Sequence, residues 1–235
     1  MAALLRRVGP SLLAALIVLT AGAWAFGVVA EEVAEGNTAR SDRRVADWLH
    51  GSATDPFTEA FRAFTWTGNG GFLAVVVLVA AVVLLRRNYV RDALFVVFAF
   101  VGAEVITFGM KQGFHRQRPF FEDPLATAGS FSFPSGHSLV SLAVYGSIAI
   151  VIARHTRNRR VAAAIVLLAA LWILAIGFSR LYLGVHFLTD VVAGYAAGAA
   201  WLALLYLALE ARSRYTSRFR GSTNEYRPKA RAQPR

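Results

Sequence analysis

The sequence predicts an all-α membrane protein, a bundle of six transmembrane helices. Of its 235 residues, 56% are hydrophobic, and most of these fall in six long apolar stretches. Lys and Arg collect in alternate connections between the stretches. Backbone groups inside a bilayer need hydrogen-bond partners within the protein, and the stretches are too long for barrel strands, so we expect each one to be a helix.

The first apolar stretch runs from Ser11 to Ala30 and follows Arg6 and Arg7. A cleaved signal peptide has the same order of charged and apolar residues, but this stretch approaches the roughly 20 residues that cross a bilayer. We therefore expect an uncleaved first span. Five further stretches follow, at residues 71–85, 93–108, 139–153, 161–178 and 188–209.

The charge distribution predicts the orientation, because positively charged flanks tend to stay in the cytoplasm. In a six-span arrangement one side receives 17 of the 25 Lys and Arg residues, at positions 6–7, 86–91, 154–160 and 212–235. Both termini are therefore expected in the cytoplasm, in a multi-pass protein of the inner or plasma membrane. The long outer loops would then face the periplasm or the exterior.

The first outer loop, residues 31–70, has the features of a short amphipathic helix. Asp55-Pro56 is a helix-start signal, and Phe57, Phe61 and Phe64 follow at helical spacing. With Trp48 and Trp66 as headgroup-level anchors, we expect an interfacial helix that lies on the membrane. A loop packed on the bundle is the alternative.

Residues 1–211 are expected to form a single membrane-embedded domain, and the basic, polar segment 212–235 a disordered cytoplasmic tail. The net charge of +11 is placed at the ends of apolar stretches, which favours contact with membrane lipids over nucleic acid. The chain has no cysteine, which excludes disulfides and thiolate chemistry. Gly194 and Gly198 permit close helix packing, with a homo-oligomer as the alternative use.

Polar side chains gather at the predicted outer ends of the third to sixth spans. Arg118 and Arg180 can each bind two oxygens of one phosphate, and Lys111 adds a compact positive charge. Such a set suits a phosphoryl group, whose transfer spreads negative charge over its non-bridging oxygens. Glu104 lies within the third apolar stretch and is expected to face the interior as a paired or neutral acid, whereas His115, Arg116, Glu122 and Asp123 are expected to be solvated loop residues.

Two histidines complete the predicted site. His186 and Asp190 are four residues apart, so the carboxylate can accept the proton of one ring nitrogen and leave a lone pair on the other, as a nucleophile requires. Ser135 and Gly136 precede the fourth span, whose first backbone amides can bind an anion. His137 at this helix start is placed to protonate a leaving alkoxide. The histidines could instead bind a metal, but only Asp190 is near, so we expect neither metal nor cofactor.

The motifs that carry these residues resemble the three signature motifs of the type-2 phosphatidic acid phosphatase superfamily. They read Lys111-x6-Arg118-Pro119, Pro134-Ser135-Gly136-His137 and Ser179-Arg180-x5-His186-x3-Asp190. The resemblance implies a six-helix membrane phosphatase that forms a phosphohistidine without metal. It implies that His186 is the nucleophile, Asp190 its orienting partner and His137 the acid, while Lys111, Arg118, Ser135, Gly136 and Arg180 bind phosphate.

The expected substrate is therefore a lipid phosphate or diphosphate, whose tail stays in the bilayer while its headgroup reaches the cations. For a bacterial host we favour undecaprenyl diphosphate, with phosphatidylglycerophosphate and phosphatidate as further possibilities. Two other functions stay open at this point. One is a non-catalytic protein that binds or transports a lipid headgroup, and the other is an oxidoreductase like the vanadium haloperoxidases, which are similar in these motifs.

Overall fold

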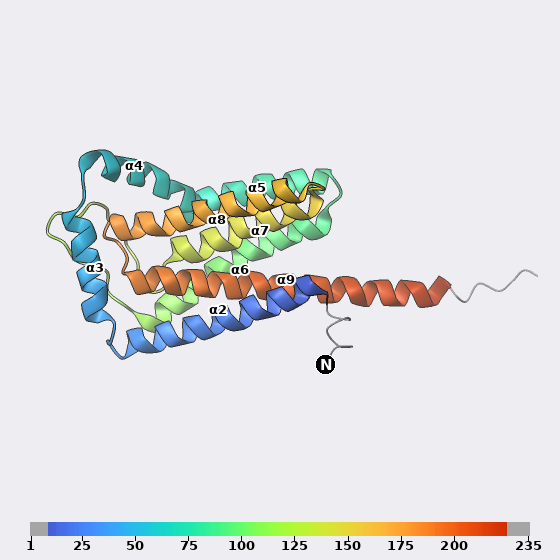
Figure 1. Ribbon diagram of the computed structural model, residues 1–235, viewed down its shortest axis with the longest axis horizontal. Coiled ribbons are helices and arrows are strands. Elements are labelled where there is room, and N and C mark those ends of the chain that lie inside the picture. Colours follow the sequence, from blue (N-terminus) through green and yellow to red (C-terminus); the bar gives the residue numbers. More distant parts are fainter. Residues whose placement is uncertain (1–8, 225–235) are drawn as a thin grey trace, which may run out of the picture.

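The six predicted apolar stretches are all helices that run side by side (Figure 1). The computed structural model describes residues 9–224, with side chains for residues 9–210. No strand occurs in this part of the chain. The long helices are α2 (Pro10–Ala34), α5 (Gly70–Arg86), α6 (Val90–Phe114), α7 (Gly136–His155), α8 (Arg159–Tyr182) and α9 (Leu188–Asn224).

Five of these helices, all except α5, are long and apolar enough to cross a membrane, which makes this a multi-pass membrane protein. A sixth span results if α5 is counted together with the short helices before it, from which it is bent by 49°. Each helix extends beyond its apolar stretch into polar flanking residues. The all-helical, multi-span architecture predicted from the apolar stretches is thus confirmed.

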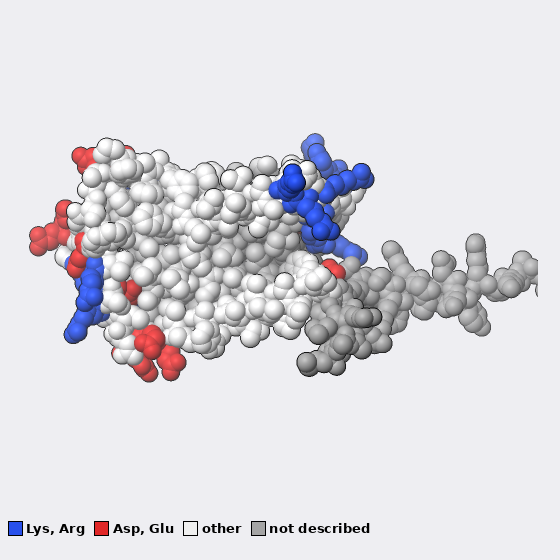
Figure 2. Space-filling view, viewed as in Figure 1, with Lys and Arg blue, Asp and Glu red and all other residues white. Residues whose placement is uncertain are grey.

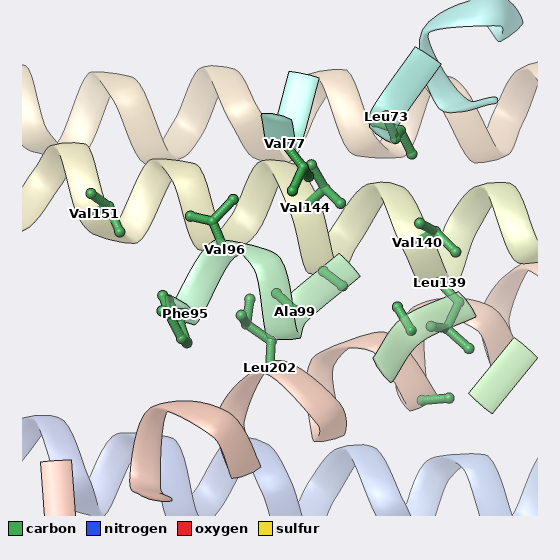
Figure 3. Packing of buried hydrophobic residues seen from close by; sticks show 13 residues of the cluster. Leu73, Val77, Phe95, Val96, Ala99, Leu139, Val140, Val144, Val151 and Leu202 are labelled. Carbon is green, nitrogen blue, oxygen red and sulfur yellow. The ribbon is translucent and has the colours of Figure 1, made fainter. Parts of the chain in front are cut away.

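The largest buried cluster joins α5, α6, α7 and α9, with α7 in the middle (Figure 3). Leu139 and Val144 of α7 belong to it, together with Val77, Val96 and Leu202 from the three neighbouring helices. On the outside of the bundle, α2 packs along α9. The cluster fixes the positions of the helices whose ends carry the predicted site residues.

Three short helices cover one end of the bundle, namely α3 (Ala39–Gly51), α4 (Asp55–Thr65) and the 3-10 helix η1 (Trp66–Gly68) (Figure 1). The helix start predicted at Asp55 is confirmed. Phe61 and Phe64 do not point away from the protein: their rings lie 4.7 Å from those of Tyr182 and Trp172 of α8. One side of α4 therefore packs on the bundle, and its position at a membrane interface stays a prediction.

The helix α3 was not predicted, because five of its 13 residues are charged and it contains no apolar stretch. Its buried residues are Asp42, Ala46 and Leu49, which share one helical face. That face turns towards the ends of α8 and α9. The charged residue on it becomes important in the site described below.

The two ends of the bundle differ in charge (Figure 2). Around the α5–α6 and α7–α8 connections the surface carries mainly Arg side chains, whereas the end covered by α3 and α4 carries most of the acidic side chains together with some basic ones. A broad band without charge separates the two ends in this view. This arrangement matches the distribution from which the orientation was predicted.

The helix α9 continues past the apolar stretch to Asn224. The disordered cytoplasmic tail expected from residue 212 onward stays a prediction. Residues 225–235, which complete the predicted tail, lie outside the described residues.

Gly194 and Gly198 serve close packing between α7 and α9, as predicted. A Cβ atom on Gly194 would lie 2.6 Å from the Ser135 carbonyl oxygen, and one on Gly198 would lie 2.9 Å from that of Leu139. Because these contacts are with backbone, they cannot be relieved by a side-chain rotation. The approach brings the start of α7 against the first turns of α9.

We expect Gly194→Ala to destabilise the fold by about 1–3 kcal/mol, the usual cost of overpacking, and to reduce activity because Ser135 must shift. Thermal unfolding in detergent measures the first effect. Gly27→Ala is the matched control, since a Cβ on this helical glycine meets nothing within 4 Å. Equal unfolding temperatures for the two variants would contradict the packing role of Gly194.

Candidate active site

A cavity of about 970 Å³ opens beside the end of the bundle covered by α3 and α4, and residues from all three motif segments line it. Of the predicted site residues, six line the cavity, namely Lys111, Arg118, Gly136, His137, Arg180 and His186. Ser135 and Asp190 lie behind its wall, and both are fully buried. The structure therefore brings the predicted residues to one place.

His186 and Asp190 form the predicted pair, but only Asp190 lies in a helix. α9 begins at Leu188, so His186 precedes the helix and Asp190 lies in its first turn. The two meet across the helix start, with 3.3 Å between His186 Nδ1 and Asp190 Oδ2. The same oxygen accepts hydrogen bonds from the Phe187 amide, at 2.8 Å, and from the Ser132 hydroxyl.

The partners of His186 determine its tautomer. Arg118 donates a hydrogen bond to Nε2 at 3.0 Å, and a guanidinium has no acceptor, so Nε2 carries the lone pair. Nδ1 then carries the proton that faces Asp190. Burial lowers the pKa of His186 to about 3, which outweighs the opposite effect of Asp190 and leaves the ring neutral near pH 7.

Arg118 and Lys111 hold the loop that closes one side of the cavity. Arg118 donates to the carbonyl oxygens of Ser130, Phe131 and Val185, at 2.6, 3.2 and 2.5 Å. Lys111 donates to the Ser130 hydroxyl at 3.1 Å and to the Phe131 carbonyl. The two cations thus lie next to each other, and Arg118 also contacts His186.

Arg180 is the most deeply placed of the three cations, with 7% of its surface exposed. It donates to the Thr65 hydroxyl at 2.9 Å, while its Nε atom is buried without a partner. Among the described residues Arg180 makes no ion pair. A buried guanidinium with an unused donor is costly and is typical of an anion-binding site.

The start of α7 differs in detail from the predicted anion cradle. The Ser135 amide is already bonded to the Asp190 carbonyl oxygen at 2.9 Å, and Ser135 does not line the cavity. The first intrahelical bond is that of Leu139 to the Ser135 carbonyl. The amides of the three residues from Gly136 onward therefore have no partner within the helix, and Gly136 and His137 face the cavity.

Glu104 also lines the cavity, close to the start of α5. A Cβ atom on Gly70 would lie 2.7 Å from its Oε1 atom. It is the single Asp or Glu among the described residues of the cavity wall, which otherwise carries positive charge. Among residues 9–210, no three His, Asp or Glu side chains come together as a metal site would require.

Four residues of the site were missed or misjudged from the sequence. Arg116 was expected to be solvated, but it binds Asp190 and also Asp42 of α3, two buried carboxylates. Ser132 and Thr65 contact Asp190 and Arg180 directly. Arg116 lies within the first motif segment and could have been suspected, whereas no pattern in the sequence links the others to the motifs.

Comparisons with known proteins agree with this geometry. The sequence profile of the PAP2 superfamily matches residues 92–214. The chain is 31% identical over 168 residues to phosphatidylglycerophosphatase B of Bacillus subtilis (strain 168), covering 69% of this chain and 78% of that protein.

Two solved structures share the fold. The crystal structure described as the first transmembrane PAP2 type phosphatidylglycerolphosphate phosphatase, from Bacillus subtilis, superposes with a TM-score of 0.75 at 23% identity, over 90% of this chain and 98% of that one. Aquifex aeolicus LpxE gives a TM-score of 0.54 at 22% identity, over 69% of this chain and 93% of that one. The profile match covers more than half of the chain and contains all three motifs from Lys111 to Asp190. The chain therefore belongs to the PAP2 superfamily and is a membrane lipid phosphatase.

Proposed function

We propose that this enzyme removes a terminal phosphate from a membrane lipid through a phosphohistidine at His186, without a metal ion, at the outer face of the membrane. One observation carries the proposal. The neutral ring of His186 carries its lone pair on Nε2, where Arg118 donates a hydrogen bond to it beside a cavity lined by four cations, while its other nitrogen faces Asp190. A nucleophile and the positive charge that its reaction needs are thus in one place.

The reaction follows in two displacements. In the first, Arg118 turns from His186 Nε2 to a phosphate oxygen, Nε2 forms a bond to phosphorus, the bond from phosphorus to the lipid oxygen breaks, and His137 gives this oxygen a proton. In the second, water attacks phosphorus, the bond to Nε2 breaks, and His137 takes up the proton of the water. Both products leave, and the two histidines return to their starting states.

The cations stabilise the charge on the transferred phosphoryl group. Arg180 has a buried Nε donor without a partner, which a phosphate oxygen would satisfy. Arg118 contacts His186, Lys111 lies beside Arg118 at Ser130, and the first amides of α7 add a positive helix end. Fixed charges can supply the stabilisation that magnesium supplies in other phosphoryl transfers.

A lipid substrate suits the position of the cavity. Phe108 and Phe120 line it, and each is exposed over more than half of its surface. Apolar side chains at the cavity wall allow a lipid tail to remain in the bilayer while its phosphate enters. The excess of Arg over acidic side chains at the opposite end of the bundle favours placing this site outside the cytoplasm.

Phosphatidylglycerophosphate is our first candidate substrate, because relatives of this chain are named for its hydrolysis. Undecaprenyl diphosphate is the second, favoured by the outward placement of the site. Both carry a terminal phosphate on a lipid, so the same chemistry serves both. The neutral histidine paired with an aspartate argues against a lipid-binding protein without turnover. A haloperoxidase would differ from the proposed enzyme in that it binds vanadate and oxidises halides.

The full-length protein, purified in detergent, is expected to release phosphate from at least one of these two lipids or from phosphatidate. The rate should not change with EDTA, because fixed cations take the role of a metal. Malachite-green detection of phosphate measures it, with the three lipids compared at one detergent concentration. Turnover that stops with EDTA and returns with magnesium would contradict the metal-free mechanism, and no turnover of any lipid would contradict the function.

A further inference from the structure

We infer that Arg116 and Asp42 are positioning residues that extend the His186–Asp190 pair into a line of four charged or polar groups. The inference rests on the proposed role of His186 as nucleophile. Neither residue is close to His186 in the sequence, since Asp42 is in α3 and Arg116 is in the loop after α6. Both nevertheless reach the carboxylate that holds the nucleophile.

The contacts form one continuous line. His186 Nδ1 faces Asp190 Oδ2, and the other oxygen of this carboxylate, Oδ1, accepts a hydrogen bond from Arg116 at 2.6 Å. The second terminal nitrogen of Arg116 donates to Asp42 Oδ2 at 2.7 Å. Asp190 and Asp42 are 0% and 2% exposed, so water does not weaken these interactions as it does at a surface.

The alternating charges along this line explain why both Arg116 and Asp42 are needed to support His186. When His186 Nε2 bonds to phosphorus with Nδ1 still protonated, the ring becomes positive, and the negative charge of Asp190 stabilises it. Arg116 fixes the position of Asp190 but competes with the ring for this negative charge. Asp42 balances the charge of Arg116, so that the three groups together keep one net negative charge beside the ring.

Other charged groups around the line are accounted for. Lys111, Arg118 and Arg180 line the cavity together with Arg116. The Arg116 guanidinium lies over the Phe187 ring, 4.6 Å from its centre. Among the described residues, Arg116 is the one Lys or Arg that forms an ion pair with Asp190.

A purely structural role for Asp42 is the alternative that the experiment must separate. Asp42 Oδ1 accepts the Thr189 amide at 3.1 Å and Oδ2 accepts its hydroxyl at 2.5 Å, so Asp42 also ties α3 to the start of α9. A tie of this kind affects stability. A positioning role affects the rate of the step in which the ring becomes charged.

The test compares Asp42→Asn with Asp47→Asn in the full-length protein. Asp47 lies on the same helix, but its pair with Arg43 is half-exposed, and neither residue lines the cavity. We expect Asp42→Asn to lower kcat about 10- to 100-fold, the range typical for loss of an outer partner of a functional histidine, with little change in KM. Rapid quench should show slower formation of the phosphoenzyme. Asp47→Asn should match the wild type.

Arg116 gives a second, independent readout. Arg116→Lys keeps the charge but cannot bind both carboxylates with one planar fork, so we expect a smaller loss of kcat than in Arg116→Ala. Added guanidinium should partly restore Arg116→Ala, which a general loss of structure would not allow. If Asp42→Asn does not fold, as judged by its unfolding temperature, the Arg116 variants alone test the inference.

Unchanged kcat in folded Asp42→Asn, a rise in KM alone, or equal rates for the Lys and Ala variants of Arg116 without rescue would overturn the inference. Turnover that survives in His186→Ala is a different outcome. It would show that the proposed function of His186 is wrong, whatever the Asp42 and Arg116 variants do.

Discussion

Replacing His186 with Ala is expected to lower kcat by about 10⁴-fold or more, as removal of a covalent nucleophile does in other hydrolases. The substitution removes Nε2, the atom that would bond to phosphorus, and leaves the three cations in place. Substrate should therefore still bind. Phosphate release from the best lipid substrate measures the loss, and binding of a slowly hydrolysed analogue measures the retained affinity.

His155→Ala is the matched control for this variant. His155 lies at the other end of the bundle, where it pairs with Asp92 at 2.8 Å, and it contacts no residue of the cavity. Its removal should leave kcat unchanged. If His155→Ala and His186→Ala had similar activities, the assignment of the nucleophile would be wrong.

Arg180→Leu is expected to lower kcat about 10²- to 10³-fold, the usual effect of removing one fixed donor that stabilises transition-state charge. At the same time we expect its unfolding temperature to hold or rise. Arg180 is buried with a single hydrogen bond and an unused donor, which stabilises a bound phosphate but not the folded protein. Kinetics and thermal unfolding on one preparation measure both effects.

Arg180→Lys separates charge from geometry in this prediction. A lysine keeps the positive charge but cannot reach two phosphate oxygens and Thr65 with one planar group. We expect activity between that of the wild type and that of Arg180→Leu. A Leu variant that unfolds at a much lower temperature than the wild type would show that Arg180 has a structural role instead.

Much of the fold could be predicted from the sequence, because a bilayer imposes strong local rules. A stretch such as 161–178 must be helical whatever it packs against, and its Arg flanks indicate its orientation. The start of α4 was equally clear from Asp55-Pro56. The helix α3 was not, because its buried face contains an aspartate that is stabilised by Arg116, far away in the sequence.

The site shows the same division between local and distant information. His186 and Asp190 are four residues apart, so their contact followed from spacing, even though His186 precedes α9. The contact of Arg116 with Asp42 spans 74 residues, and that of Arg180 with Thr65 spans 115. Such contacts depend on how the outer helices fold over the bundle, and no periodic pattern encodes them.

The most direct test of the account is to trap the intermediate. The enzyme is mixed with a lipid substrate labelled in its terminal phosphate, quenched in alkali, where phosphohistidine survives, and analysed by mass spectrometry. We predict label on the peptide that contains His186, and none in His186→Ala. Label on another residue, or turnover by the wild type without any labelled protein, would contradict attack by His186 on phosphorus.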